Sequence, residues 1–242
     1  MKFLLAFQVL FVFGIWIVPS LTQKPWDSVA RTEQWWIERH QQFIASSANL
    51  GSDIKIVFLG SSLVEYWGTQ GKPVWDANYA PLGAINYGIG GDRTEHVIWR
   101  IDNGELDGLT PKLVVLYVGS NNVPVNSNND EIVRGVNTVV DRLHAKLPNT
   151  NILLVATFPR ADQSDVPGTL RRIRDIDQKL EALVGGDAQR KGNFIDLFWF
   201  LAPSSLDRIY EHLYVADKLH LNLDGYTMWH REMNSTFHRL IQ

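Results

Sequence analysis

The 242-residue chain has a net charge of −3, no cysteine, and a hydrophobic content of 45%. This length and composition fit one globular domain, and the slightly acidic balance gives no electrostatic support for binding nucleic acid or an anionic membrane surface. The absence of cysteine excludes disulfides, thiolate metal sites and cysteine nucleophiles.

The N-terminal residues resemble a secretory signal peptide. Lys2 gives a short basic start, residues 4–18 are largely apolar, and Pro19, Ser20 and Thr22 supply an exit of small residues. We therefore predict a signal peptide over residues 1–22 and a single domain over residues 23–242 of a secreted protein. The apolar run of about 15 residues is short for a membrane span, so an uncleaved anchor is the second interpretation.

The next elements lead to a pair of serines. Residues 26–45 have amphipathic spacing and predict a helix. Residues 54–59 then form a short apolar run typical of a buried strand, which ends at Gly60 and is followed by Ser61, Ser62 and a helix. A serine at this junction lies where open α/β sheets bind ligands, so Ser62 is a candidate nucleophile. The alternative is that one of the two serines only caps the helix.

Strands and helices alternate through the remaining sequence. This alternation predicts an α/β fold with a parallel sheet. Strands are expected at 84–87, 112–118, 151–157 and 194–197, helices at 94–103, 131–147, 170–184 and 223–241, and irregular segments at 68–81 and 198–217. The last helix carries the only N-glycosylation sequon, which begins at Asn234.

Polar clusters follow several of these strands, and loops after parallel strands collect at one edge of the sheet. Glycines at 88, 90 and 91 can present a backbone N–H to a substrate or simply form a turn, and their spacing does not match a dinucleotide fingerprint. Asn121 can donate from its carboxamide to an oxyanion, or belong to a turn. Asp217 and His220 can pair so that the imidazole faces a serine hydroxyl, or lie on a surface turn. No spacing of acidic residues and histidines indicates a metal site.

Taken together, Ser62, Gly91, Asn121, Asp217 and His220 occur in an order that resembles the SGNH (GDSL-like) hydrolase superfamily. The segments 86–106, 115–122 and 217–226 are similar to the catalytic subunits of intracellular platelet-activating-factor acetylhydrolase. The resemblance implies a three-layer α/β/α sandwich with a five-stranded parallel sheet.

The same resemblance implies the site and its chemistry. Ser62 would be the nucleophile, His220 the base and Asp217 the residue that orients His220. The N–H groups of Ser62 and Gly91 and the side chain of Asn121 would form the oxyanion hole. No cofactor or metal is implied. The expected function is hydrolysis of a short acyl ester, such as an acetyl ester of a phospholipid, through an acyl-enzyme. A homodimer is also expected from the resemblance.

Two features depart from the family pattern. Ser61 stands where the family usually has Asp, and the signal-like N-terminus differs from the cytosolic enzymes that the chain resembles. Two alternatives therefore stay open: a carbohydrate O-acetylesterase, and a catalytically silent secreted relative that binds lipid or glycan. A nucleotide-binding protein of flavodoxin type would share the sheet, but the chain lacks a phosphate-binding loop.

Overall fold

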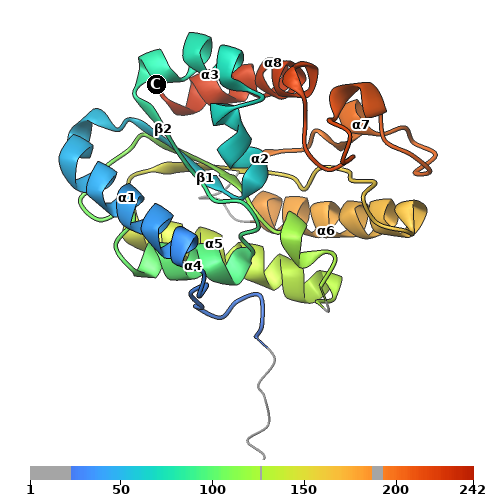
Figure 1. The fold of residues 1–242 in the computed structure, drawn as a ribbon, viewed down its shortest axis with the longest axis horizontal. Coiled ribbons are helices and arrows are strands. Elements are labelled where there is room, and N and C mark those ends of the chain that lie inside the picture. The colour runs from blue at the N-terminus through green and yellow to red at the C-terminus, as the bar shows by residue number, and fades with distance from the viewer. Residues whose placement is uncertain (1–22, 126, 187–192) are drawn as a thin grey trace, which may run out of the picture.

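The computed structural model describes residues 23–125, 127–186 and 193–242. Five parallel strands form one sheet in the order β2-β1-β3-β4-β5 (Figure 1). The strands are β1 Ile56–Gly60, β2 Ala84–Gly88, β3 Leu113–Tyr117, β4 Asn151–Val155 and β5 Phe194–Ile195. Gly60 at the end of β1 lies in register with Gly88 and Tyr117, so three strands end side by side. The predicted five-stranded parallel sheet is confirmed.

Helices cover both faces of this sheet. In Figure 1, α3 and α8 lie above the sheet, and α4, α5 and α6 lie below it. The helices are α1 Gln34–Leu50, α2 Ser62–Glu65, α3 Lys72–Asn78, α4 Thr94–Asp102, α5 Asn129–Lys146, α6 Val166–Gly186, α7 Phe198–Leu201 and α8 Leu223–Leu240. The predicted three-layer α/β/α sandwich is therefore confirmed.

The central strands are buried on both faces. Every residue of β1 and β3 is buried, as their continuous apolar sequences predict. Above the sheet, Phe58 packs against the rings of Trp67 and Tyr79, and Trp67 also contacts Trp229 of α8. Large aromatic side chains contribute much of the buried apolar area of a core, so this cluster fixes α8 against the sheet.

The first helix begins later than the sequence predicts. Residues 24–33 form a non-helical segment, which we call the strap, and helix α1 runs from Gln34 to Leu50 instead of from 26 to 45. Tertiary contacts hold the strap: Val29 N–H donates to the carbonyl of Glu95, and the Arg134 guanidinium lies 3.8 Å from the Trp26 ring centroid. The prediction of a helix over residues 26–45 is therefore wrong for its first two turns, because these contacts override the amphipathic pattern.

Other boundaries differ by less. The segment 68–81 contains the short helix α3, the segment 198–217 contains α7, and β5 ends at Ile195 instead of residue 197. Asn234 lies on α8 as expected. The predicted signal peptide falls outside the described residues. Within the described ranges, no helix is long and apolar enough to cross a membrane.

Candidate active site

A sharp turn at the end of β1 presents the two serines. Gly60 adopts φ of 159°, and a Cβ atom there would lie 2.0 Å from the carbonyl oxygen of Tyr117 on the neighbouring strand β3. Only glycine allows this close approach of two strand ends. The chain can therefore leave the sheet directly after Gly60 and start helix α2 at Ser62.

The structure distinguishes the two serines. Ser61 occupies the N-cap position of α2 with extended backbone angles, but its side chain makes no capping hydrogen bond. Ser62 is the first residue of α2, and its Oγ lies 2.8 Å from Nε2 of His220. The simple capping interpretation thus fails for both side chains, and the residue that faces the imidazole is Ser62.

A compact turn before α8 holds the histidine. Asp217 Oδ1 accepts hydrogen bonds from the backbone N–H groups of Leu219 and His220, both at 2.9 Å. Its other oxygen, Oδ2, lies 2.6 Å from Nδ1 of His220. Lys218 adopts a positive φ of 57° to close this turn, and its carbonyl accepts from the N–H of Ala161. The predicted residues Asp217, His220 and Ser62 therefore form one hydrogen-bonded chain.

The environment of this chain favours an ionised carboxylate. Partial burial of Asp217 alone would raise its pKa, but hydrogen bonds from the backbone N–H and the imidazole of His220 outweigh this effect and lower the pKa. Because an ionised carboxylate can only accept, the hydrogen of the neutral imidazole lies on Nδ1 and bonds to Asp217, and Nε2 of His220 can accept from the Ser62 hydroxyl. The Tyr66 ring packs against the imidazole with ring centroids 4.6 Å apart, which limits its rotation.

The two other predicted donors come from the loops after β2 and β3. Gly91 adopts a positive φ of 80°, and Asn121 lies in a short 3-10 helix. The Asn121 Nδ2 donates to the carbonyl of Asp92 at 3.0 Å, so the side chain is held beside the loop that contains Gly91. This bond uses one of the two amide hydrogens and leaves the other for a further acceptor.

Two charged side chains that the sequence analysis did not identify, one buried and one partly exposed, tie these loops together. Arg100, which is fully buried, donates to Asp92 Oδ2 at 2.8 Å, to the carbonyl of Gly60 at 3.3 Å and to both oxygens of Glu105. Glu65, in α2, accepts from the N–H of Gly90 at 2.8 Å. The serine turn and the glycine loop are therefore joined by two charged side chains. The sequence signal for Arg100 is a run of charges inside the segment 86–106, and Glu65 lies outside that segment.

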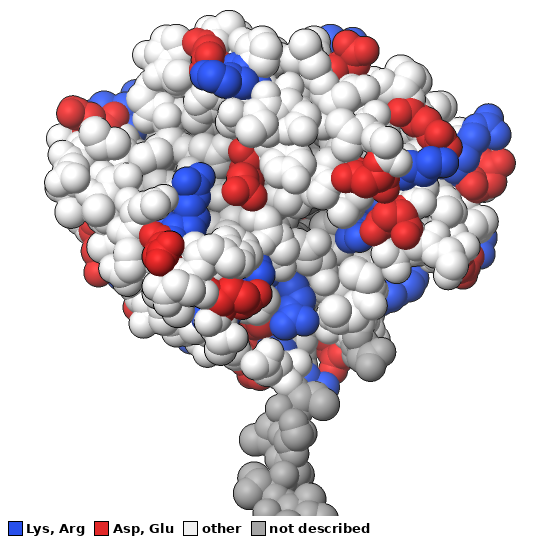
Figure 2. Space-filling model, viewed as in Figure 1, with Lys and Arg blue, Asp and Glu red and all other residues white. Residues whose placement is uncertain are grey.

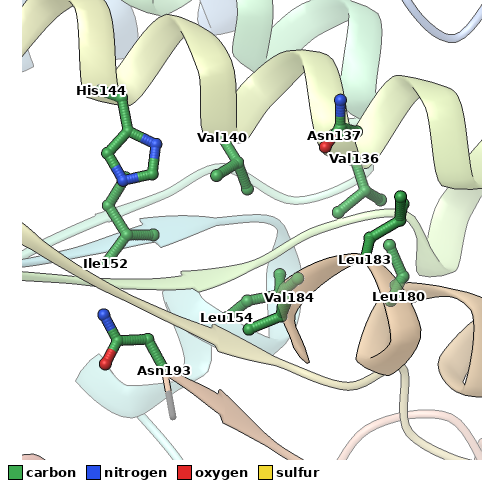
Figure 3. Close-up of a pocket in the computed structure, with 10 residues that line it drawn as sticks. All are labelled: Val136, Asn137, Val140, His144, Ile152, Leu154, Leu180, Leu183, Val184 and Asn193. Atoms are coloured by element: carbon green, nitrogen blue, oxygen red, sulfur yellow. The ribbon is translucent and has the colours of Figure 1, made fainter. Parts of the chain in front are cut away.

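Two hollows differ in their relation to this site. A partly open cavity between α5, α6 and β4 is lined mainly by apolar side chains, including Val136, Val140 and Leu180 (Figure 3). Its volume of about 20 Å³ holds little more than one water molecule, so it cannot take an ester substrate. An open hollow of about 470 Å³ is lined by Gly91 and Asn121 together with residues of the strap. Among the described residues, no group of three or more acidic or histidine side chains could hold a metal ion.

A comparison with protein families defines the class. The model of the GDSL-like lipase/acylhydrolase family matches residues 58–228, and the chain belongs to this family of carboxylic ester hydrolases. The match spans all the residues discussed above from the serine turn to the His220 turn, but it does not include the strap or α1.

Individual relatives refine this placement. The chain is 31% identical over 207 residues to platelet-activating factor acetylhydrolase IB subunit alpha1 from Homo sapiens, covering 85% of this chain and 84% of the relative. It is similar in fold to a GDSL-like lipase from Bacteroides thetaiotaomicron, with a TM-score of 0.68, 17% identity and coverage of 83% and 97%. It is also similar to a Geobacillus acetyl-xylooligosaccharide esterase variant, with a TM-score of 0.57, 19% identity and coverage of 79% and 95%.

Proposed function

We propose that this acylhydrolase is a serine esterase that releases a short acyl group through an acyl-enzyme. The observation that carries the proposal is the hydrogen-bonded chain from Asp217 through His220 to Ser62, located where β1 ends. A hydroxyl is a weak nucleophile by itself, and a neighbouring imidazole that takes its proton activates it.

The geometry supports a two-step reaction. Ser62 Oγ attacks the ester carbonyl while its proton passes to Nε2 of His220, and this proton then goes to the departing alcohol. The acyl-enzyme is hydrolysed by a water molecule whose proton His220 takes in turn. Asp217, held by two backbone N–H groups, keeps the Nδ1 hydrogen in place and stabilises the imidazolium that forms.

Three groups are proposed to stabilise the tetrahedral oxyanion: the N–H of Ser62, the N–H of Gly91 and the carboxamide of Asn121. The Ser62 N–H belongs to the first turn of α2, where backbone donors have no partner within the helix. The amide hydrogen of Asn121 that does not bond to Asp92 can point toward the same oxygen. Removing one such donor typically costs about 3 kcal/mol of transition-state stabilisation.

The test of this proposal is labelling by a fluorophosphonate, which reacts with activated serines. Wild-type protein and Ser61→Ala should be labelled, whereas Ser62→Ala should not. No labelling of folded wild-type protein would favour the alternative of a silent lipid- or glycan-binding relative. Labelling that depends on Ser61 instead of Ser62 would refute the assignment of the nucleophile.

An acetyl ester is the proposed substrate, and its alcohol part has two candidates. The human relative is named for the acetylhydrolysis of platelet-activating factor, which supports an acetyl phospholipid. The Geobacillus neighbour is named for acetylated xylooligosaccharides, which supports a sugar ester as the second candidate. The ratio of kcat/KM for an acetyl phospholipid and for acetylated xylooligosaccharides distinguishes them.

Secretion and dimerisation are further parts of the proposal. The signal-like residues 1–22 support export, which is tested by sequencing the N-terminus of protein recovered from the culture medium. A mature chain that begins near residue 23 is expected. The homodimer rests on family resemblance, and light scattering of the purified protein measures the molecular mass that decides it.

A further inference from the structure

The open hollow beside the two oxyanion donors has polar walls on the side of the strap. We call it the strap hollow, and it is lined by Arg31, Thr32 and Glu33 of the strap, by Gly91 and Arg93, and by Asn121. Its volume of about 470 Å³ lies within the range of small-ligand sites. Because Gly91 and Asn121 belong to its wall, a molecule bound there lies next to the reacting carbonyl.

Arg31 is fixed directly over Gly91. Its Nη1 donates to the carbonyl of Gly90 at 2.8 Å, and a Cβ atom built on Gly91 would lie 3.0 Å from the same nitrogen. On its outer side, Arg31 pairs with Glu33 through a 2.6 Å contact. The strap thus positions one guanidinium beside the backbone of Gly90 and Gly91.

Arg93 adds a second guanidinium to this wall. Its Nε lies 2.7 Å from Glu95 Oε1, and within the described part of the chain no acceptor bonds to its Nη1 or Nη2. The side chain is about one quarter exposed, and it is two residues from Gly91. Two free Nη groups of one arginine match the paired oxygens of a phosphate or a carboxylate.

The wall of the strap hollow presents two guanidinium groups, each of which is paired with a carboxylate on one side. His96, which also lines it, accepts a hydrogen bond from the N–H of Arg93 through Nδ1, and burial followed by the nearby arginines lowers its pKa to about 3, so it is neutral. The hydrogen bond from Arg31 lowers the pKa of Glu33 to about 2, so this carboxylate is ionised. The wall therefore holds Arg31, Arg93 and the carboxylate of Glu33, while Glu95 contacts Arg93 at 2.7 Å and Asp92 lies 3.5 Å from Arg31.

We propose that the strap hollow is the leaving-group subsite, and that Arg31 and Arg93 select esters whose alcohol part carries an anionic group, either phosphate or carboxylate. This inference rests on the proposed esterase function. It assigns the selectivity partly to the strap, which lies outside the segment matched by the family model. It also predicts that esters of anionic alcohols are better substrates than esters of neutral sugars.

The experiment compares matched acetyl esters that differ only in charge. One pair is the acetyl ester of 4-hydroxybenzoate and that of 4-hydroxybenzamide, and the second pair is O-acetylglycerol phosphate and O-acetylglycerol. The wild type should prefer the anionic member of a pair, and Arg93→Gln should reduce that preference about 10- to 100-fold in kcat/KM. Arg93→Lys keeps the charge but loses the fork of two donors, so its preference for the anionic ester should lie between those of the wild type and Arg93→Gln.

Arg231→Gln is the matched control, because it removes an equally charged side chain from the exposed surface of α8. It should keep the wild-type preference. A preference in the phosphate pair or in the carboxylate pair supports the subsite and identifies the anion. The inference is overturned if the wild type treats both members of each pair alike, or if Arg93→Gln lowers both rates equally. Protein that is neither labelled by fluorophosphonate nor active on any of the four esters would instead refute the esterase proposal.

Discussion

Replacing Asp217 with asparagine changes which atoms donate and accept hydrogen bonds in the site, while the side chain keeps nearly the same shape. In the wild type, Oδ1 accepts from the N–H groups of Leu219 and His220, and Oδ2 faces Nδ1 of His220. The amide oxygen of the introduced asparagine must stay at the Oδ1 position, because an NH2 group there would face two donors. The amide NH2 then faces Nδ1, which must give up its hydrogen to accept.

This rearrangement places the imidazole in the wrong tautomer. A neutral imidazole without hydrogen on Nδ1 carries it on Nε2, which lies 2.8 Å from Ser62 Oγ and can no longer accept the serine proton. The variant also loses the negative charge that stabilises the imidazolium during attack. Together these effects are expected to lower kcat by about 10³- to 10⁴-fold, equivalent to about 4–5.5 kcal/mol of activation free energy.

The assay is kcat for hydrolysis of p-nitrophenyl acetate, together with the rate of fluorophosphonate labelling and the thermal melting temperature. The matched control is Asp224→Asn, which makes the same chemical change on an exposed residue at the start of α8. The control should keep wild-type kinetics. The reasoning would be refuted by an Asp217→Asn protein that melts like the wild type and keeps more than about a tenth of its kcat.

Three further predictions concern stability. Gly60→Ala should lower the free energy of unfolding, measured with urea, by at least about 3 kcal/mol, because the added Cβ would overlap the Tyr117 carbonyl. A smaller loss would mean that the ends of β1 and β3 can separate. Lys218→Val should lower the free energy of unfolding by about 1–2 kcal/mol and slow fluorophosphonate labelling, because a β-branched side chain disfavours the positive φ of residue 218. Unchanged labelling would contradict the role of this turn in holding His220. Asp177 is fully buried, which raises its pKa well above the usual range, so its protonated form favours the folded state. As the pH rises above about 4, the free energy of unfolding of the wild type should therefore fall relative to that of Asp177→Asn. The fall should be up to about 1.4 kcal/mol per pH unit and should stop once the pH exceeds the pKa of Asp177 in the folded protein. Urea titrations of both proteins across pH measure this difference, and a constant difference would exclude the effect.

Local sequence patterns predicted the sheet well, because every strand is a short apolar run followed by a turn. The residues of the site could be named because each one follows a strand or belongs to a motif that resembles the family. Their distances could not be predicted from such patterns, since they depend on the strand order and on the turn at Lys218. The resemblance supplied the expected pairing, and the 2.8 Å contact between His220 and Ser62 agrees with it.

Two kinds of feature escaped the sequence analysis. The strap has the hydrophobic spacing of a helix, yet its contacts with Glu95 and Arg134 hold it in a non-helical conformation, and no local pattern encodes those partners. Arg100 and Glu105 also look like solvated charges in the sequence, although they are buried and paired. Burial of a charge depends on a partner elsewhere in space, which a single sequence does not reveal.

Acidic and basic side chains are interspersed on the face shown in Figure 2, so the local arrangement of charges near the site matters more than any field of the whole molecule.

The position of the His220 turn has a consequence for biosynthesis. Ser62 is made early, but its partner lies next to the last helix, and a backbone bridge between Tyr214 and Leu221 closes the segment that carries it. A nascent chain that has emerged only as far as β5 therefore holds a serine without a base. Under the mechanism proposed above, the chain would become competent for ester hydrolysis only when the C-terminal segment docks, and a truncated product would be inert toward esters.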